Sequence, residues 1–363
     1  MTKLPLIQVL RAVAALAVAL HHAQYDGVLL AKATGLAFEP LTWLPWSAGV
    51  DLFFVISGFI MVHASRDLFG RRDSVATFLA RRIARIVPLY WAVSALYLML
   101  ALAAPSLLNS AILEPWPVAA SFLFVPFERP DGLVQPLYSL GWTLNYEMFF
   151  YGLFALVIMQ PRRKALTLLA GLLAALATLG AVADLPQPVA FWTDGIILEF
   201  AFGLLLGHMR AEGVRLGRMV RAGVAVCGLL ILACDLTALG VPRFLAWGLP
   251  AACLIAAAAL GEGTSVRTRS VHRATALGDA SYALYLLHPF AVRGGRALVT
   301  TLGVAELFGV WGYIGVVLLA SIAAALMVHR LVEKPVTDAV GRWLGAASAA
   351  PRRLAPIHPA VER

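Results

Sequence analysis

The chain has 363 residues, of which 61% are hydrophobic and 13% are charged. Soluble domains carry about 25% charged residues, so the composition excludes an ordinary soluble protein and indicates a polytopic membrane protein. The formal net charge is +9 at pH 7, and the basic residues lie in short loops between apolar segments. We therefore expect this charge to face lipid headgroups and anionic ligands and not nucleic acid. The three cysteines all lie in apolar segments and predict neither a disulfide framework nor a metal site.

Ten apolar segments are about as long as a membrane-spanning helix, which needs about 20 residues. The first is interpreted as a retained helix and not as a signal peptide, because Arg11 adjoins its apolar run and the residues that follow make a poor cleavage site. A shorter apolar stretch at 117–127 predicts a re-entrant or interfacial piece. The expected spans are 5–24, 46–65, 84–104, 139–160, 164–184, 191–209, 219–239, 243–261, 278–298 and 308–330.

The distribution of basic residues predicts the orientation of these spans. With the N-terminus in the cytoplasm, all but five of the Lys and Arg residues fall on the cytoplasmic side, as the positive-inside rule requires. The five exceptions are Lys32, Arg129, Arg243, Arg293 and Arg296. We therefore expect an all-α membrane domain over 1–344 with both termini cytoplasmic, followed by a disordered cytoplasmic tail at 345–363.

The first segment places a charge and an imidazole on one side of a helix. Arg11 and His22 are eleven residues apart, so on an α-helix they share a face and are separated by about 16 Å along the axis. His21 lies about 100° away. Ionisable groups inside a membrane are costly and are functional candidates for that reason.

Other spans contribute further ionisable groups. Asp51 lies near the expected depth of His22 and is a candidate to orient its imidazole, although an Asp at a helix start near the headgroups is the simpler alternative. Glu147 lies about 12 Å into its span, and Tyr151 follows one turn later on the same face. His288 precedes Pro289, so it is either functional or a partner for backbone groups that the proline frees. Glu199 is a further candidate in the sixth span.

Arg82 and Arg85 project together from the third span, because residues three apart are neighbours on a helix. A paired guanidinium face suits bidentate binding of phosphate. A positive-inside anchor is the alternative for the same residues.

Six motifs in order resemble the membrane acyltransferase-3 family, and in detail the O-acetyltransferases of exopolysaccharide production within it. The resemblance covers roughly residues 5–336. The motifs are Arg11 and His22 with ten residues between them, the run 49–59, Arg81-Arg82 with Arg85 and Pro88, Trp142-Thr143-Leu144 with Glu147 and Tyr151, Ser281-Tyr282 with Tyr285 and His288, and Glu333-Lys334-Pro335.

This resemblance implies an O-acyltransferase of the bacterial inner (cytoplasmic) membrane. It would move an acyl group, usually acetyl from acetyl-CoA, to a carbohydrate hydroxyl, with acyl-CoA as a substrate and no permanently bound cofactor. His22 matches the family's essential histidine, Arg11 its paired arginine, and Arg82 with Arg85 the cytoplasmic arginines. The expected partners are the donor, a glycan acceptor, the bilayer and possible polysaccharide-assembly machinery. Further polar candidates are Ser57, Trp142, Tyr151, Glu199, Ser281, Tyr285 and His288.

These expectations combine into one mechanism. Acetyl-CoA would dock inside with its phosphates near Arg82 and Arg85, and His22 would act as the base near the outer side, oriented by Asp51 or Glu147. Arg11 would line the path between them. A proton-coupled transporter or flippase for a sugar or an anionic metabolite is the main alternative, since intramembrane His, Asp and Glu also suit proton coupling. A non-catalytic scaffold of a polysaccharide-assembly complex is a third possibility.

Overall fold

The computed structural model describes residues 4–103, 113–262 and 269–345. Within these ranges the chain is built of helices, and no strand longer than a single bridge occurs. Six helical segments of this part of the chain are long and apolar enough to cross a membrane. They are Pro5–Thr34, Trp46–Ala64, Ser74–Ala103, Arg162–Val182, Val189–Ala211 and Ala305–Trp343, and Phe244–Ala259 is a shorter apolar helix. The protein is therefore an all-helical, multi-pass membrane protein.

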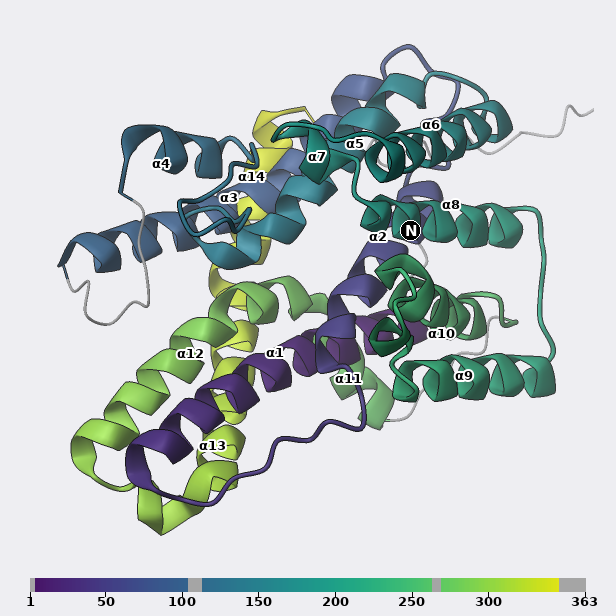
Figure 1. The fold of residues 1–363 in the computed structure, drawn as a ribbon. Helices are drawn as coiled ribbons and strands as arrows, with labels where there is room; N and C mark the ends of the chain where they lie inside the picture. Colours follow the sequence, from purple (N-terminus) through teal and green to yellow (C-terminus); the bar gives the residue numbers. More distant parts are fainter. Residues whose placement is uncertain (1–3, 104–112, 263–268, 346–363) are drawn as a thin grey trace, which may run out of the picture.

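Figure 1 shows the helices packed against one another without layers of sheet. In chain order they are α1 (Pro5–Thr34), α2 (Gly49–Ala64), α3 (Ser74–Ala103), α4 (Pro115–Phe122), α5 (Trp142–Val157), α6 (Arg162–Val182), α7 (Val189–Trp192), α8 (Leu198–Ala211), α9 (Arg218–Ala233), α10 (Leu249–Ala259), α11 (Arg269–Asp279), α12 (Ser281–Leu302), α13 (Ala305–Val328) and α14 (Lys334–Trp343).

Two helices are longer than the apolar segments predicted. α1 extends ten residues beyond the expected end at 24 and stops at Gly35, whose left-handed backbone (φ 74°) lets its N–H reach the carbonyl of Ala31. α3 begins ten residues before the expected start at 84, so its first three turns carry the arginines of the third span. In both cases hydropathy marks only the lipid-facing part of a helix, while the helix itself continues wherever polar side chains find partners.

The stretch at 117–127 forms only the eight-residue helix α4 and a loop, which is too short to cross a bilayer. Its end is held by α3, because the Tyr90 hydroxyl donates to the carbonyl of Ser121 at 3.1 Å and the Trp91 indole donates to that of Phe122 at 2.9 Å. The expected tail at 345–363 lies, from residue 346 onward, outside the described residues.

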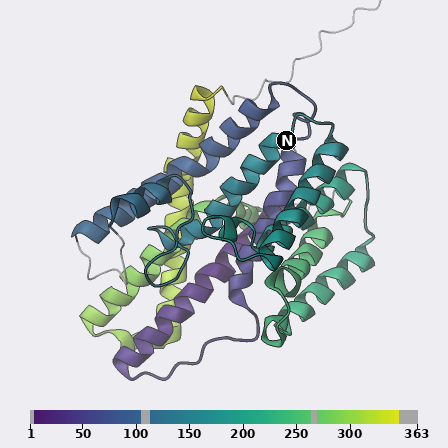
Figure 2. The same cartoon turned by 45° about the horizontal axis from the view of Figure 1, so that its top comes forward.

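α1 and α12 lie side by side and run in the same direction (Figures 1 and 2). Three polar contacts join them in the same order along both helices. Arg11 donates to the Ser281 hydroxyl at 2.9 Å, and further along the rings of His22 and His288 meet at 3.2 Å. Near the far end, Arg296 and Asp26 form an ion pair at 2.6 Å. This last pair explains why an arginine is tolerated so far along the ninth expected span.

α2 and α8 approach so closely that their backbones touch through glycines. A Cβ at Gly203 would lie 2.1 Å from the carbonyl oxygen of Val55, and one at Gly58 would lie 2.2 Å from that of Phe200. Gly207, one turn after Gly203, lies against the side chain of Val62, where a Cβ would come within 2.7 Å of the Val62 Cβ. Small residues at such positions drive helix association in membranes, where dispersion contacts replace the hydrophobic effect. This contact fixes α2, and therefore Asp51 and Ser57, against the body of the protein.

The end of α8 is tied to the start of α6. Glu212 accepts hydrogen bonds at 2.5 Å from both Arg162 and Arg163. Hydrogen bonds from Arg163 and Arg162 lower the pKa of the Glu212 carboxyl to about 2. The carboxylate therefore stays ionised at neutral pH and holds the side chains of Arg162 and Arg163 in place.

The glycine contact gives a test of the fold. We expect Gly203→Ala to lower the thermal unfolding midpoint of the detergent-solubilised protein, because the new methyl group forces α8 away from α2 at a cost of about 1–3 kcal/mol. Gly171→Ala on α6 is the matched control, since a Cβ there meets nothing within 4 Å. Equal midpoints for the two variants, measured by tryptophan fluorescence, would contradict the close approach of α2 and α8.

Candidate active site

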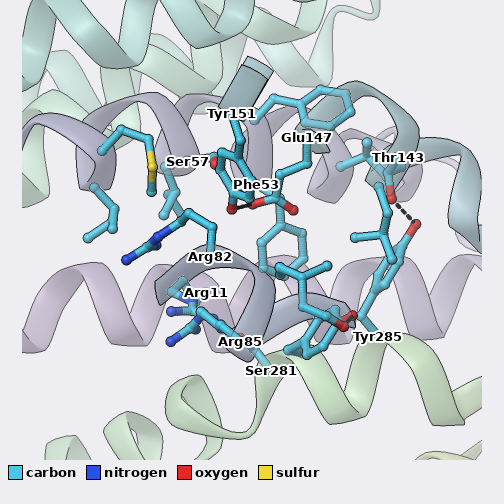
Figure 3. Close-up of a pocket in the computed structure, with 18 of the residues that line it drawn as sticks. Arg11, Phe53, Ser57, Arg82, Arg85, Thr143, Glu147, Tyr151, Ser281 and Tyr285 are labelled. Atoms are coloured by element: carbon cyan, nitrogen blue, oxygen red, sulfur yellow. Dashed lines mark hydrogen bonds between the residues drawn. The ribbon is translucent and has the colours of Figure 1, made fainter. Parts of the chain in front are cut away.

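A cavity of about 240 Å³ lies among α1, α2, α3, α5 and α12. It is far larger than the space that one water molecule needs. Its charged and polar lining comes from residues that are distant in sequence, and Figure 3 shows most of them, those that it labels, around one space. These residues are Gln8, Arg11, Ser57, Arg82, Arg85, Thr143, Glu147, Tyr151, Ser281, Tyr282 and Tyr285.

Three guanidinium groups gather at one end of this cavity (Figure 3). Arg82 and Arg85 extend from α3, and Arg11 reaches them from α1 while donating to Ser281. The Nε of Arg82 is buried and finds no hydrogen-bond partner among the described residues. Among the described residues that line the cavity, Glu147 is the one carboxylate. Three cations against one anion make this end of the cavity attractive to an anionic ligand.

Glu147 occupies the middle of the cavity and is held from two sides. Ser57 on α2 donates to its Oε1 at 3.0 Å, and Tyr151 on α5 donates to the same oxygen. The predicted cluster of Glu147 and Tyr151 is therefore present and includes Ser57 as a third member. These bonds fix the carboxylate without neutralising it.

The end of the cavity opposite the arginines carries two hydroxyl groups. Thr143 and Tyr285 lie 2.9 Å apart through their oxygens, and Figure 3 places this pair away from the guanidinium groups. Tyr285 is also a ring neighbour of His288, with centroids 6.3 Å apart. The cavity thus ends next to the histidines, although neither imidazole lines it.

His22 and His288 form a pair of imidazoles. The Nε2 of His288 lies 3.2 Å from the Nδ1 of His22, and the ring centroids are 5.0 Å apart. His288 is fully buried, whereas His21 is exposed, as the helical geometry predicts for a residue on another face. The Nδ1 of His288 also meets the carbonyl of Leu284 at 3.1 Å. His288 therefore contacts both a backbone carbonyl and the ring of His22, and a functional role for it stays a prediction.

The expected pairing of Asp51 with His22 is wrong. Asp51 is fully buried, and Arg243 binds it with two hydrogen bonds of 2.9 and 2.8 Å. The guanidinium also lies over the rings of Trp142 and Trp247, with 5.8 and 4.8 Å to the centroids. A guanidinium matches a carboxylate in shape and charge, which an imidazole does not. Glu147 is likewise engaged by Ser57 and Tyr151 and not by His22.

Glu199 belongs to the Asp51 cluster and not to the cavity. It is fully buried, and neither of its carboxyl oxygens has a hydrogen-bond partner among the described residues. Its side chain lies against Gly248, where a Cβ would come within 2.7 Å of Cγ. The electrostatic neighbours of Glu199 include both Asp51 and Arg243. The Arg243 guanidinium thus hydrogen-bonds to Asp51 and also lies close enough to Glu199 to interact with it electrostatically.

The cavity brings together eight of the residues singled out from the sequence, and the rest lie beside it. Inside are Arg11, Ser57, Arg82, Arg85, Glu147, Tyr151, Ser281 and Tyr285; outside are His22, His288, Asp51, Glu199 and Trp142. Sequence reasoning missed Arg243, which it counted only as an outer basic residue. The signal was available, since Asp51 and Arg243 both start apolar spans on the expected outer side. Among the described residues no cluster of His, Cys, Asp and Glu suits a metal ion.

The fold and the site together define a class of protein. It is a multi-pass helical membrane protein with a cationic internal cavity and a histidine pair at the far end of that cavity. The model of the acyltransferase domain family, acyltransferase-3, matches residues 5–330 of the chain. The chain belongs to this family, and it is an acyltransferase.

Two characterised relatives resemble the chain over most of its length. The exopolysaccharide production protein ExoZ of Rhizobium meliloti (strain 1021) is 33% identical over 298 residues, which cover 80% of this chain and 89% of the relative. Acyltransferase MdmB of Streptomyces mycarofaciens is 29% identical over 380 residues, which cover 96% and 95% of the two chains. No solved structure matches the chain at a significant level.

The ion pair of Asp51 gives a second prediction. We expect Arg243→Met to destabilise the protein by about 3–5 kcal/mol, because it leaves a buried carboxylate without a counter-charge. The double variant Asp51→Asn/Arg243→Met should recover most of this loss, as measured by the unfolding midpoint in detergent. Arg71→Met is the control for an exposed pair, since Arg71 binds the exposed Asp73, and such pairs contribute at most about 1 kcal/mol. Equal losses for Arg243→Met and Arg71→Met would refute a buried pair.

Proposed function

We propose that the protein transfers an acyl group, in the first instance acetyl from acetyl-CoA, to a hydroxyl of an exopolysaccharide or another cell-surface glycan. The observation that carries this proposal is the polarity of the cavity, with three arginines at one end and hydroxyl groups beside a histidine pair at the other. Acyl transfer from a thioester to a sugar needs a site for the anionic donor and a base for a weakly acidic hydroxyl. In this proposal the arginine end of the cavity supplies the donor site, and the histidine end supplies the base.

The donor end is formed by Arg82, Arg85 and Arg11. Coenzyme A carries phosphates, which guanidinium groups bind with charge-assisted and often bidentate hydrogen bonds. The unpartnered Nε of Arg82 leaves one donor free for such a ligand. The cavity then offers the acyl-bearing arm a path past Ser57 and Glu147 toward Thr143 and Tyr285.

The acceptor end is the histidine pair. In this proposal His22 takes the proton of the sugar hydroxyl, which raises the nucleophilicity of the oxygen for attack on the acyl carbonyl carbon. Arg11 belongs to the donor end and acts on the donor, because about 16 Å separates it from His22 along the helix. Asp51, Glu199 and Arg243 support α2 and α8 and take no proton from substrate.

The directions of neighbouring helices agree with ten spans that alternate in direction, and the distribution of basic residues supports both termini in the cytoplasm. In that layout α1 and α12 are the first and ninth spans and run the same way, as their three contacts require. α2 and α8, the second and sixth spans, also run parallel, since the pairs 58 with 203 and 62 with 207 keep the same order. α6 and α8 run antiparallel, as Gly180 meets Thr193 while Arg162 meets Glu212. Cytoplasmic arginines and an outward-facing histidine pair follow from this layout.

A glycan acceptor is supported by the relative that is named for exopolysaccharide production. Membership in an acyltransferase family weighs against the alternative of a proton-coupled transporter or flippase. The bacterial inner membrane, where acetyl-CoA is available on one side and an exported glycan passes to the other, is the compartment that suits both substrates. Enzymes of polysaccharide assembly are then the expected neighbours.

The base is tested directly with purified protein in liposomes. We expect His22→Ala to abolish transfer of labelled acetyl from acetyl-CoA to the surface polysaccharide of the host, because the variant lacks the proposed base. His21→Ala should retain activity, because His21 is exposed on another face of α1. Normal transfer by a folded His22→Ala variant would refute the proposed mechanism. Mass spectrometry of the polysaccharide with and without the protein identifies the group transferred.

The donor end is tested by neutralising one arginine. We expect Arg82→Gln to raise the KM for acetyl-CoA about tenfold or more, because one charge-assisted contact to phosphate contributes about 1.5–3 kcal/mol. Arg81→Gln is the matched control, as Arg81 precedes it on the same helix and does not line the cavity. An unchanged KM for Arg82→Gln, or an equal rise in both variants, would place the donor elsewhere.

A further inference from the structure

The contacts of the two imidazoles determine where their protons lie. The Nδ1 of His22 is 3.0 Å from the carbonyl oxygen of Val18, and the Nδ1 of His288 is 3.1 Å from that of Leu284. A carbonyl oxygen can only accept a hydrogen bond, so each Nδ1 must carry a proton. The neutral form of each ring then has a lone pair on Nε2.

The contact between the rings fits this assignment and no other neutral one. The Nε2 of His288 lies 3.2 Å from the Nδ1 of His22. With protons on both Nδ1 atoms, the N–H of His22 is shared between the Val18 carbonyl and the Nε2 lone pair of His288. If His288 donated from Nε2 instead, the lone pairs of both Nδ1 atoms would face carbonyl oxygens. Neighbouring groups thus fix the tautomer of a histidine.

We propose that His288 is a positioning residue for His22: it accepts the Nδ1 proton and thereby holds the Nε2 of His22 free as the basic nitrogen. This inference rests on the proposed function, in which His22 is the base. His288 takes the place that a carboxylate fills beside many catalytic histidines, although it is neutral. Asp51 and Glu147, the carboxylates expected in this place, are bound by other partners.

The step is then complete in protons and bonds. The sugar hydroxyl gives its proton to Nε2 of His22 as its oxygen bonds to the acyl carbon. The bond from that carbon to the sulfur of coenzyme A breaks, and the leaving thiolate takes the proton from Nε2. While His22 is an imidazolium, its Nδ1–H remains bonded to Nε2 of His288 and the Val18 carbonyl, which stabilise the charge. His288 keeps its own proton on Nδ1 throughout, bound to Leu284.

A neutral acceptor suits the surroundings of the pair. His288 is fully buried. A carboxylate at this place would need a counter-charge of its own, as Asp51 has in Arg243. An imidazole supplies the lone pair without that requirement.

Two variants of His288 separate positioning from packing. In His288→Gln the side-chain amide oxygen can reach the place of Nε2 and still accept the proton of His22, whereas His288→Leu fills similar space without an acceptor. We expect His288→Leu to lower kcat roughly 10- to 100-fold with an unchanged KM for acetyl-CoA, as for other partners that orient a functional imidazole. His288→Gln should retain most of kcat. Equal kcat values for the two variants would overturn the proposal.

A measurement without turnover tests the same point. The ¹⁵N chemical shifts of the His22 ring, assigned by comparison with His22→Gln, distinguish a protonated nitrogen from one with a lone pair. We expect a proton on Nδ1 and a lone pair on Nε2 in the wild-type protein, and a larger share of the other tautomer in His288→Leu. A proton on Nε2 of neutral wild-type His22 would overturn the proposal even if acetyl transfer is observed. Loss of the proposed function itself would appear separately, as a wild-type protein that transfers no acetyl group.

Discussion

The parallel pairing of α1 with α12 is the interaction on which the rest of the structure depends. These helices are far apart in the sequence, yet three polar contacts join them in register: Arg11 with Ser281, His22 with His288, and Asp26 with Arg296. Polar groups in a bilayer must find partners within the protein, so each contact restricts rotation and sliding of one helix on the other. Two of these contacts involve residues of the site: Arg11 belongs to the proposed donor end, and His22 with His288 forms the histidine pair. The same interaction therefore holds the fold together and sets the spacing of the site.

The other buried charges obey the same constraint away from the cavity. Asp51 and Glu199 start α2 and α8, and the glycine contact between these helices brings the two carboxyl groups together. The buried Asp51 carboxylate requires a counter-charge, and Arg243 supplies it from the segment that leads into α10. α2 is thus fixed at one end by a charge cluster and along its length by backbone contact. Ser57, in the middle of α2, is consequently aimed at Glu147 in the cavity.

The sequence predicted the positions of functional groups better than their partners. Arg82 and Arg85 could be assigned to the expected cytoplasmic end, with Arg11 on the path from it to His22, because helical spacing and the positive-inside rule are local or additive properties. The choice of Arg243 for Asp51 and of His288 for His22 depends on which helices are neighbours, and hydropathy carries no information on that. The predicted end of the first span and the predicted start of the third were wrong for a related reason. α1 and α3 continue through polar residues because Asp26 pairs with Arg296 and Arg82 enters the cavity. A polar residue ends an apolar run, but it does not end a helix.

In the proposed function, the separation of charge along the cavity lets one helical bundle bind two unlike substrates. Three guanidinium groups at one end attract phosphate, and the same field would disfavour protonation of a histidine placed among them. The imidazole pair lies instead beyond Thr143 and Tyr285, next to neutral hydroxyl groups. There His22 can accept the proton of a hydroxyl substrate, as the proposed mechanism requires, while the arginines keep their charge for the donor. In that mechanism the distance between Arg11 and His22 on one helix has a function, because phosphate binding and proton acceptance would oppose each other at a single point.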